Sequence, residues 1–511
     1  MKACKGFSMC IAPLAMALAM LAGQKTAAQQ SSSAAEDRAA RMESELRSIS
    51  AVLSATRAQL DDAQQKVQEL ETELAELRGQ HLAPGPGEPS EGGTGASSSV
   101  AALAAAVADI REQQAVLQEE VKQHDQVKLE SASKYPVRVS GLVLFNAFSN
   151  HGGVDNIDLP AIALPVATGS SNISAGGSFR QTILGLQGFG PHVLGARTSA
   201  DISIDFFAGI AYSSYGTSAG TVRMRTAAVN MDWARHSLEF GLTKPLISPR
   251  SPASYASVAE PAMSGAGNLW AWAPQIVYRG HFSAQRDHGF GVDAGLLDMP
   301  AAGYNANELF RTASPGELSG QPAYESRLFW KSERDDGPQI GISGLYNRQR
   351  YSASPSVDGW AGAADWQMPL APRLNLTGEA YRGRALGGLG GGVYKDVVSG
   401  DSPSTGAETI RPLDAAGGWT QLKSTFDHGL ETNVAFGLDD GFAAAFHALV
   451  LPSTAGGTQL RARNRMISAN LIFRPKTYLI FSPEYRRIWT WEITGPPSTA
   501  DIFTMSAGYE F

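Results

Sequence analysis

The stretch that decides the fold is Phe503-Thr504-Met505-Ser506-Ala507-Gly508-Tyr509-Glu510-Phe511, the last nine residues of the sequence. Large apolar or aromatic residues alternate along it with small or polar ones. In an extended strand such alternation places the two sets on opposite faces. An aromatic residue at the end of such a strand is typical of the signal that the barrel-assembly machinery of the outer membrane reads. We therefore take Tyr509 and Phe511 as a candidate assembly signal.

The same period of two appears further upstream. In residues 479–491 the apolar side chains again share one face, with Trp489 and Trp491 at its end, where a membrane barrel carries an aromatic girdle. Residues 196–206 alternate between apolar side chains and Arg, Ser or Asp. Residues 178–188 and 221–233 change phase, which predicts bulges there.

Short and long connections alternate between these strands. The short turns fall near residues 188–193, 234–236, 283–289, 333–337, 369–373, 427–429 and 474–476. The long Gly/Pro/Ser-rich loops cover residues 150–177, 209–220, 245–272, 298–323, 350–357, 385–415, 439–462 and 490–499. These connections predict about 16 antiparallel strands, and lipid requires the sheet to close on itself. The expected fold class is an all-β transmembrane barrel preceded by an α-helical coiled coil.

Composition narrows the class further. The 511 residues are 18% charged, their mean hydropathy is -0.15 and their formal net charge is -7. A helical membrane protein and a nucleic-acid partner are both disfavoured. The only cysteines are Cys4 and Cys10, so disulfide frameworks and thiolate metal sites are not expected.

The first 134 residues predict a targeting segment followed by coiled-coil segments. Residues 1–28 have a basic start, an apolar run and small residues, as in a secretory signal peptide, with a single membrane anchor as the alternative. Residues 29–82 carry a heptad repeat, residues 83–99 form a Pro/Gly/Ser linker, and residues 100–134 hold a second, weaker coiled-coil segment. We expect a parallel coil of three chains in the periplasm. An antiparallel hairpin within one chain is the alternative. Residues 135–511 would form the barrel.

Three stretches together resemble a known family. They are residues 185–207 (with Gly185-Leu186-Gln187-Gly188-Phe189-Gly190-Pro191), Arg223-Met224-Arg225-Thr226-Ala227, and residues 245–261 (Pro245-Leu246-Ile247-Ser248-Pro249 to Glu260-Pro261). They resemble trimeric outer-membrane porins, most closely DcaP-like porins, whose members also carry a coiled coil ahead of the barrel. The resemblance implies a homotrimer with three separate pores, and uptake of small, often anionic, solutes.

Arginines are the candidate pore-lining residues. From residue 135 onward there are 24 Arg and only 5 Lys, and rings of Arg favour anions in a pore. The candidates by strand phase are Arg197, Arg223, Arg225, Arg382, Arg384 and Arg486. Residues 245–272 resemble the infolded third loop of porins, in which Arg250 and Glu260 are constriction candidates. Pairing with lumen carboxylates such as Asp205 is the competing role for each arginine.

The sequence offers no catalytic constellation, zinc spacing or phosphate-binding loop, so we expect neither an enzyme nor a bound cofactor or metal. The favoured hypothesis is a passive diffusion channel for small hydrophilic solutes in the outer membrane of a Gram-negative-type cell. A non-selective or sugar-permeable porin is one alternative. A structural tether, whose coil reaches peptidoglycan, is another. Expected partners are two further copies, outer-membrane lipid, the barrel-assembly machinery and small solutes.

Overall fold

The computed structural model describes residues 136–511, except 210–219, 286–287, 302–311, 333–336, 352–355 and 452–456. The chain divides into two compact units, residues 1–128 and 129–511, and only the second contains described residues. The predicted signal peptide, both coiled-coil segments and the linker lie outside the described residues. In the part that is described, no helix is long and apolar enough to cross a membrane.

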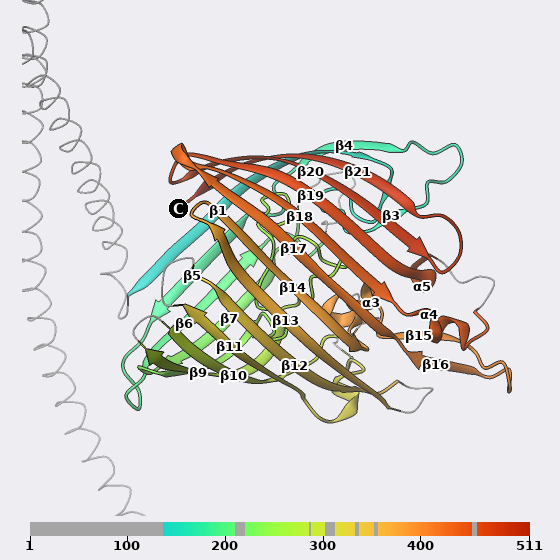
Figure 1. Ribbon diagram of the computed structural model, residues 1–511, viewed down its shortest axis with the longest axis horizontal. Helices are drawn as coiled ribbons and strands as arrows, with labels where there is room; N and C mark the ends of the chain where they lie inside the picture. Colours follow the sequence, from blue (N-terminus) through green and yellow to red (C-terminus); the bar gives the residue numbers. More distant parts are fainter. Residues whose placement is uncertain are drawn as a thin grey trace, which may run out of the picture. The chain divides into compact units, whose positions relative to one another are not determined.

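A closed antiparallel sheet forms the wall of the second unit (Figure 1). Its strands are β1 (Val137–His151), β4 (Ile173–Ser178), β5 (Ile183–Phe189), β6 (Arg197–Asp205), β7 (Arg223–Asp232), β8 (His236–Thr243), β9 (Ala273–Gln285), β10 (His288–Leu297), β11 (Ala323–Ser332), β12 (Gln339–Gln349), β13 (Val357–Ala371), β14 (Leu374–Arg384), β17 (Asp414–Phe426), β18 (Leu430–Gly441), β19 (Arg461–Lys476), β20 (Leu479–Glu492) and β21 (Ser498–Glu510). Because β4 and β5 pair with the two halves of β1, they act as one interrupted strand. The barrel therefore has 16 strands, as predicted.

The two predicted changes of phase have local causes. Between β4 and β5 the chain leaves the sheet at residues 179–182. In β7 the register shifts so that Ser203 faces Thr226 while Ile204 faces Met224, which leaves Arg225 as an extra residue. Arg223 and Arg225 both contact the same partner inside the barrel, Asp205.

Alternation separates an outer from an inner face. On β21, Phe503, Met505 and Tyr509 are each about half exposed, whereas Ile502 and Ser506 are buried on the opposite face. An apolar outward face combined with backbone pairing on both sides of every strand is what a lipid environment requires. The last strand therefore presents the face that its sequence predicts.

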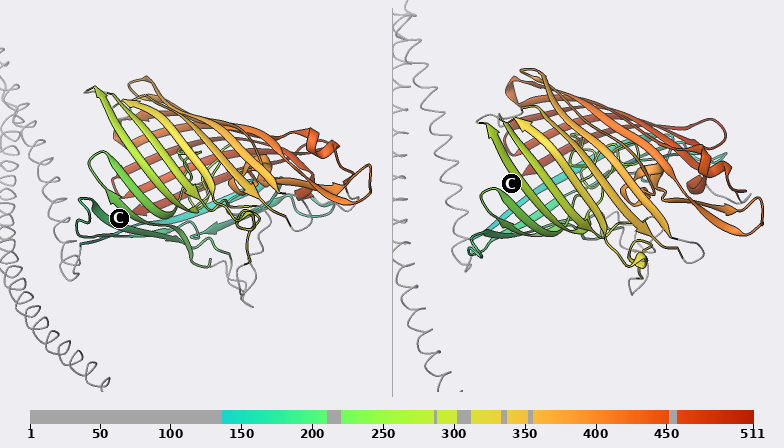
Figure 2. Two further views of the ribbon diagram at one scale, coloured as in Figure 1. Left: turned by 90° about the horizontal axis from the view of Figure 1, so that it is seen from below. Right: turned by 60° about the horizontal axis from the view of Figure 1, so that its bottom comes forward.

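Connections differ at the two barrel ends, as Figure 2 shows. One end carries short turns, such as residues 372–373 between β13 and β14 and the 3-10 turn η3 (Asp427–Gly429). The other end carries the long loops. They contain the small elements β2 (Gly153–Val154), β3 (Ala163–Leu164), η1 (Glu317–Ser319), η2 (Gly387–Leu389), α3 (Gly391–Tyr394), β15 (Val397–Asp401), β16 (Glu408–Pro412), α4 (Ala443–His447) and α5 (Gly457–Leu460).

Candidate functional site

The third loop, residues 244–272, folds into the barrel instead of standing outside it. The Arg250 backbone N–H donates to Glu379 Oε1 on β14 at 2.5 Å, and the Ala253 N–H donates to Gln421 Oε1 on β17 at 3.1 Å. Asn470 Nδ2 on β19 donates to the Ala253 carbonyl at 2.9 Å. Because these partners lie on strands far from β8 and β9, which the loop connects, the loop must cross the lumen.

The return half of the loop is held by another set of inward side chains. Gln181, between β4 and β5, accepts hydrogen bonds from the N–H groups of Val258 at 2.7 Å and Ala259 at 3.0 Å. Arg223 donates to the Ala259 carbonyl at 2.9 Å. Gln181 is 1% exposed, so it acts as a buried clamp on the loop.

Two further loops join the third loop inside the barrel. In the sixth loop (residues 385–413) the Leu389 carbonyl accepts the N–H of Trp270 at 2.9 Å. In the first loop (residues 152–172) the N–H of Ala163 donates to Thr490 Oγ1 on β20 at 2.9 Å. Together the three loops narrow the lumen with buried apolar residues, including Ile247, Leu269 and Leu389.

Arg223 and Arg225 lie on the inward face beside the third loop. Arg223 donates to both oxygens of Asp205, at 3.1 and 2.7 Å, and Arg225 lies 3.5 Å from the same carboxylate. The two guanidinium carbons stand 5.1 and 4.8 Å from the ring centroid of Trp272. Two cations thus share one buried anion, so these three side chains together carry one positive charge, with the Glu260 carboxyl nearby.

The two candidates in the third loop have different surroundings. Arg250 Nε donates to Asp365 on β13 at 3.0 Å, and Arg327 on β11 holds the same carboxylate at 2.8 Å. Arg250 is therefore paired with the wall and not with Glu260. Burial raises the pKa of Glu260 to about 7, against the opposing charge of nearby Arg223.

Two further candidates, Arg486 and Arg197, share the strand phase of inward residues, but their surroundings differ. Arg486 is on the inward face but only 4% exposed, where it donates to the Pro160 carbonyl, Ser257 and Glu484. It fastens two loops to β20. Arg197 is exposed at the short-turn end of β6, far along the strand from Asp205.

The prediction that Arg382 and Arg384 line the pore is wrong, because both side chains point out of the barrel. Their neighbours Tyr381 and Gly383 are buried on the inward face, and Arg382 is exposed. Arg382 stacks on Phe442 at 3.9 Å, and Arg384 pairs with Asp414 at 3.0 Å. The assignment failed because it assumed that every charged face of a strand faces the lumen. Near the ends of long strands the outer face is polar too.

Several inward charged residues were not predicted from the sequence. Arg327 holds Asp365, Arg279 pairs with Glu239 at 3.0 Å, and Arg180 pairs with Asp158 at 3.0 Å. The alternation of Glu325 and Arg327 with Tyr324 and Leu328 was a usable signal for the first pair. Arg180 lies in the break between β4 and β5, where alternation carries no information.

A cavity of about 370 Å³ opens in the lumen on the short-turn side of the third loop. Its lining includes Arg250, Gln367, Asn375, Gln421 and Lys423. Polar side chains therefore surround water-accessible space next to the loop that crosses the barrel. Among the described residues there is no cluster of His, Cys, Asp and Glu suited to a metal ion.

A closed 16-stranded barrel with an infolded third loop defines the porin type of membrane barrel fold. The outer membrane channel DcaP of Acinetobacter baumannii has a similar structure, with a TM-score of 0.55 and 16% sequence identity over 74% of this chain and 99% of that one. The anion-selective porin from Comamonas acidovorans (TM-score 0.45, 9% identity, 74% of this chain and 100% of that one) and OmpF of Salmonella typhi (TM-score 0.45, 11%, 74% and 98%) are more distant. No family model and no curated protein matches the sequence.

Proposed function

We propose that this protein is an outer-membrane porin, a passive diffusion channel for small hydrophilic solutes. The observation that carries the proposal is the third loop pinned across the lumen of a closed barrel, beside polar water-accessible space. Such a loop narrows a wide barrel to a size-selective passage. The described residues offer hydrogen-bonding and charged groups along that passage.

A preference for anions is the finer part of the proposal. Arg223 and Arg225 share a single carboxylate, and their planar groups suit carboxylate or phosphate solutes. The opposing consideration is that most inward arginines are paired, which favours the non-selective or sugar-permeable porin as the second candidate. The structural tether rests on the coil sequence alone.

The assembly proposed is a homotrimer inserted by the barrel-assembly machinery. Strands β5 to β8 are 7–10 residues long, whereas β17 to β21 are 12–16 residues long, so one side of the barrel is lower than the other. The low, apolar side suits contact with further copies better than contact with a full bilayer. The coil would extend into the periplasm, with peptidoglycan as its candidate partner.

Single-channel recording in a salt gradient tests the function. The wild-type chain should conduct, and Arg223→Ala with Arg225→Ala should shift the reversal potential towards cation permeability, most strongly at low salt. Arg384→Ala is the matched control, because that arginine lies outside the lumen. Absence of conductance from the folded barrel would refute the channel. An unchanged permeability ratio in the double variant would favour the non-selective porin.

A further inference from the structure

Arginines gather on the outer wall of the barrel, at the long-loop ends of β12 to β20. They are Arg348, Arg382, Arg384, Arg463, Arg465 and Arg487. Four outward carboxylates accompany them, namely Asp358, Asp414, Asp440 and Asp501. Six cations against four anions leave this arginine belt a net positive charge. At the same ends of β6 to β11 the outward residues are apolar, as Met224, Ile276 and Leu296 illustrate.

Three arginines of the belt lie against aromatic rings: Arg382 against Phe442, and Arg465 and Arg487, beside the groove described below, against tryptophans. The Arg465 guanidinium lies 5.1 Å from the ring centroid of Trp491, and that of Arg487 lies 5.2 Å from Trp489. Arg487 also reaches Asp501 at 3.5 Å, whereas among the described residues Arg465 has no carboxylate at ion-pair distance. Stacking fixes the plane of a guanidinium but leaves its edge N–H groups available to an anion.

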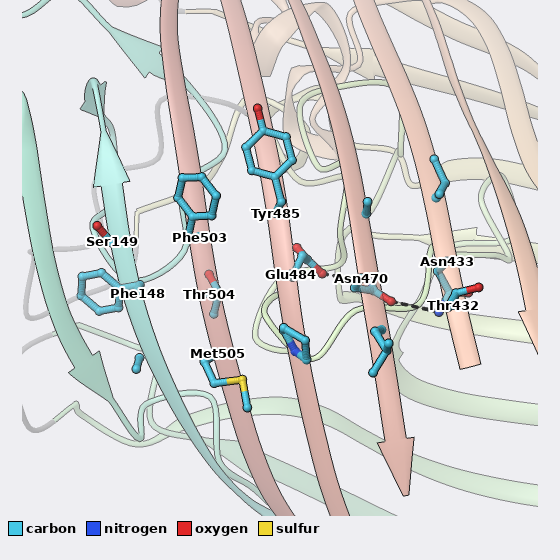
Figure 3. A pocket seen from close by; sticks show the side chains of 15 residues that line it. Phe148, Ser149, Thr432, Asn433, Asn470, Glu484, Tyr485, Phe503, Thr504 and Met505 are labelled. Carbon is cyan, nitrogen blue, oxygen red and sulfur yellow. Dashed lines mark hydrogen bonds between the residues drawn. The ribbon is translucent and has the colours of Figure 1, made fainter. Parts of the chain in front are cut away.

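A shallow groove on the same outer wall lies next to these arginines. It has a volume of about 760 Å³ and runs across β18 to β21 and β1 (Figure 3). Its outward lining is mostly apolar, with the larger Phe503 and Met505 on β21 and the small Ala469 on β19 and Ala147 on β1 to either side of them. Tyr485 joins groove and belt, because its ring lies 5.1 Å from Phe503 while its hydroxyl donates to Asp501 at 2.6 Å.

The order of the groove and the arginines along the strands matches the order of the hydrocarbon and headgroup layers of a bilayer. Tyr485 and Arg487 are successive outward residues of β20, so the arginine lies about 7 Å further along the strand than the groove. A tilted strand crosses the hydrocarbon with about 9–11 residues. Because β19 has 16 and β20 has 14, their ends reach beyond the hydrocarbon into the headgroup layer.

We propose that Arg465 and Arg487, together with the groove, bind a phosphorylated glycolipid of the outer leaflet. The arginines would contact its phosphate and the groove would hold an acyl chain. The proposal rests on the proposed outer-membrane location of the barrel. A lipid is preferred to a second copy of the chain, because the belt is net positive and lies on the long strands that span the bilayer fully.

The test uses the full-length protein purified in detergent, with lipopolysaccharide as the probe and the same material after dephosphorylation. Native mass spectrometry counts bound lipid per barrel, and titration gives its affinity. The Arg465→Gln and Arg487→Gln double variant should bind phosphorylated lipid about tenfold or more weakly, as expected for loss of charge-assisted hydrogen bonds. Dephosphorylation should weaken wild-type binding to a similar extent.

Two controls separate the possible causes. Arg235→Gln with Arg373→Gln removes two arginines from turns at the opposite end and should leave lipid binding unchanged. Ala469→Trp fills the groove and should weaken binding even where the arginine variant fails to fold, whereas Ala294→Trp, outward on β10, should not.

Equal lipid binding by wild type and both site variants would overturn the proposal. So would a variant that loses subunits while its barrels keep the same amount of lipid, because the surface would then join copies of the chain. Inorganic phosphate that competes fully with lipid would show an anion site without a role for the groove. A barrel that binds lipid but does not conduct would refute the porin function and leave this site intact.

Discussion

At the scale of single residues, the inner charge of the barrel depends on which groups share a partner. Asp205 is fully buried, accepts from Arg223 and Arg225, and also accepts the N–H of Phe207 at 3.0 Å. One carboxylate therefore sets the spacing of two cations and anchors the end of β6. The net charge that a passing solute meets is the small difference between the numbers of positive and negative side chains. Single substitutions should therefore change the sign or the size of this net charge.

Replacing Asp205 with Asn should raise anion preference, the opposite of the effect of removing the two arginines. The amide keeps the shape but leaves two cations without their anion, so cations in the pore meet a higher barrier. Breaking a buried ion pair also costs about 3–5 kcal/mol of stability. Reversal potentials and thermal unfolding measure the two effects. Asp201→Asn, further along the same strand, is the control, and a shift towards cations in the Asp205 variant would contradict the argument.

Glu260 should make ion selectivity depend on pH. Because burial raises the pKa of Glu260 to about 7, this carboxyl is neutral in mildly acidic solution and charged in mildly alkaline solution. Its negative charge offsets Arg223, so anion preference should be greater below about pH 7 and smaller above it. Glu260→Gln should hold the acidic-side value at all pH. A wild-type permeability ratio that is flat between about pH 5.5 and 8.5 would exclude this role.

At the scale of elements, strands and loops differ in what the sequence reveals. The strand count and the outward face of β21 follow from a period of two, because lipid on one side and water on the other act at every residue. The detailed path of the third loop does not follow from alternation, because its contacts are with residues far away in the sequence, as between Gln181 and Val258 or between Arg250 and Glu379. The outward position of Arg382 was missed because alternation says which residues share a face, and not which face meets lipid.

Gln181 should control how firmly the third loop is held. In Gln181→Leu the N–H groups of Val258 and Ala259 lose their acceptor, and a stranded buried group costs about 1–3 kcal/mol. We expect a more mobile loop, with noisier current and larger mean conductance. Gln339→Leu, an inward glutamine near the short-turn end of β12, serves as the control. Quiet, wild-type current from a folded Gln181 variant would show that other contacts suffice to hold the loop.

At the scale of the whole molecule, formation of the barrel depends on the pairing of the first strand with the last. β1 pairs with β21 from Leu142 opposite Glu510 to His151 opposite Asp501. The terminal residue extends this seam, since the Gly141 N–H donates to the Phe511 carbonyl at 2.8 Å and the Phe511 N–H donates back at 3.0 Å. An unclosed edge would expose unpaired backbone groups to lipid, so the seam decides whether a barrel forms at all.

Deleting Phe511 should sharply lower the amount of folded, heat-modifiable barrel in the outer membrane. Two causes are possible, namely loss of a signal to the assembly machinery and loss of the seam itself. Gly141→Val separates them, because a Cβ at Gly141 would lie 2.7 Å from the Phe511 ring and displace it while leaving the terminal sequence intact. Phe503→Ala, which removes an outward aromatic elsewhere on β21, is the control.

Refolding into detergent, where no machinery is present, completes the comparison. If Phe511 acts as a signal, the deletion variant should refold as well as wild type in detergent and fail only in cells, whereas Gly141→Val should be impaired in both. If the seam dominates, both variants should refold poorly. Wild-type levels of the deletion variant in cells would remove Phe511 from assembly altogether. The hypothesis that Phe511 is an assembly signal would then be wrong. The closed 16-stranded barrel, which is defined by backbone pairing, would not be affected by that result.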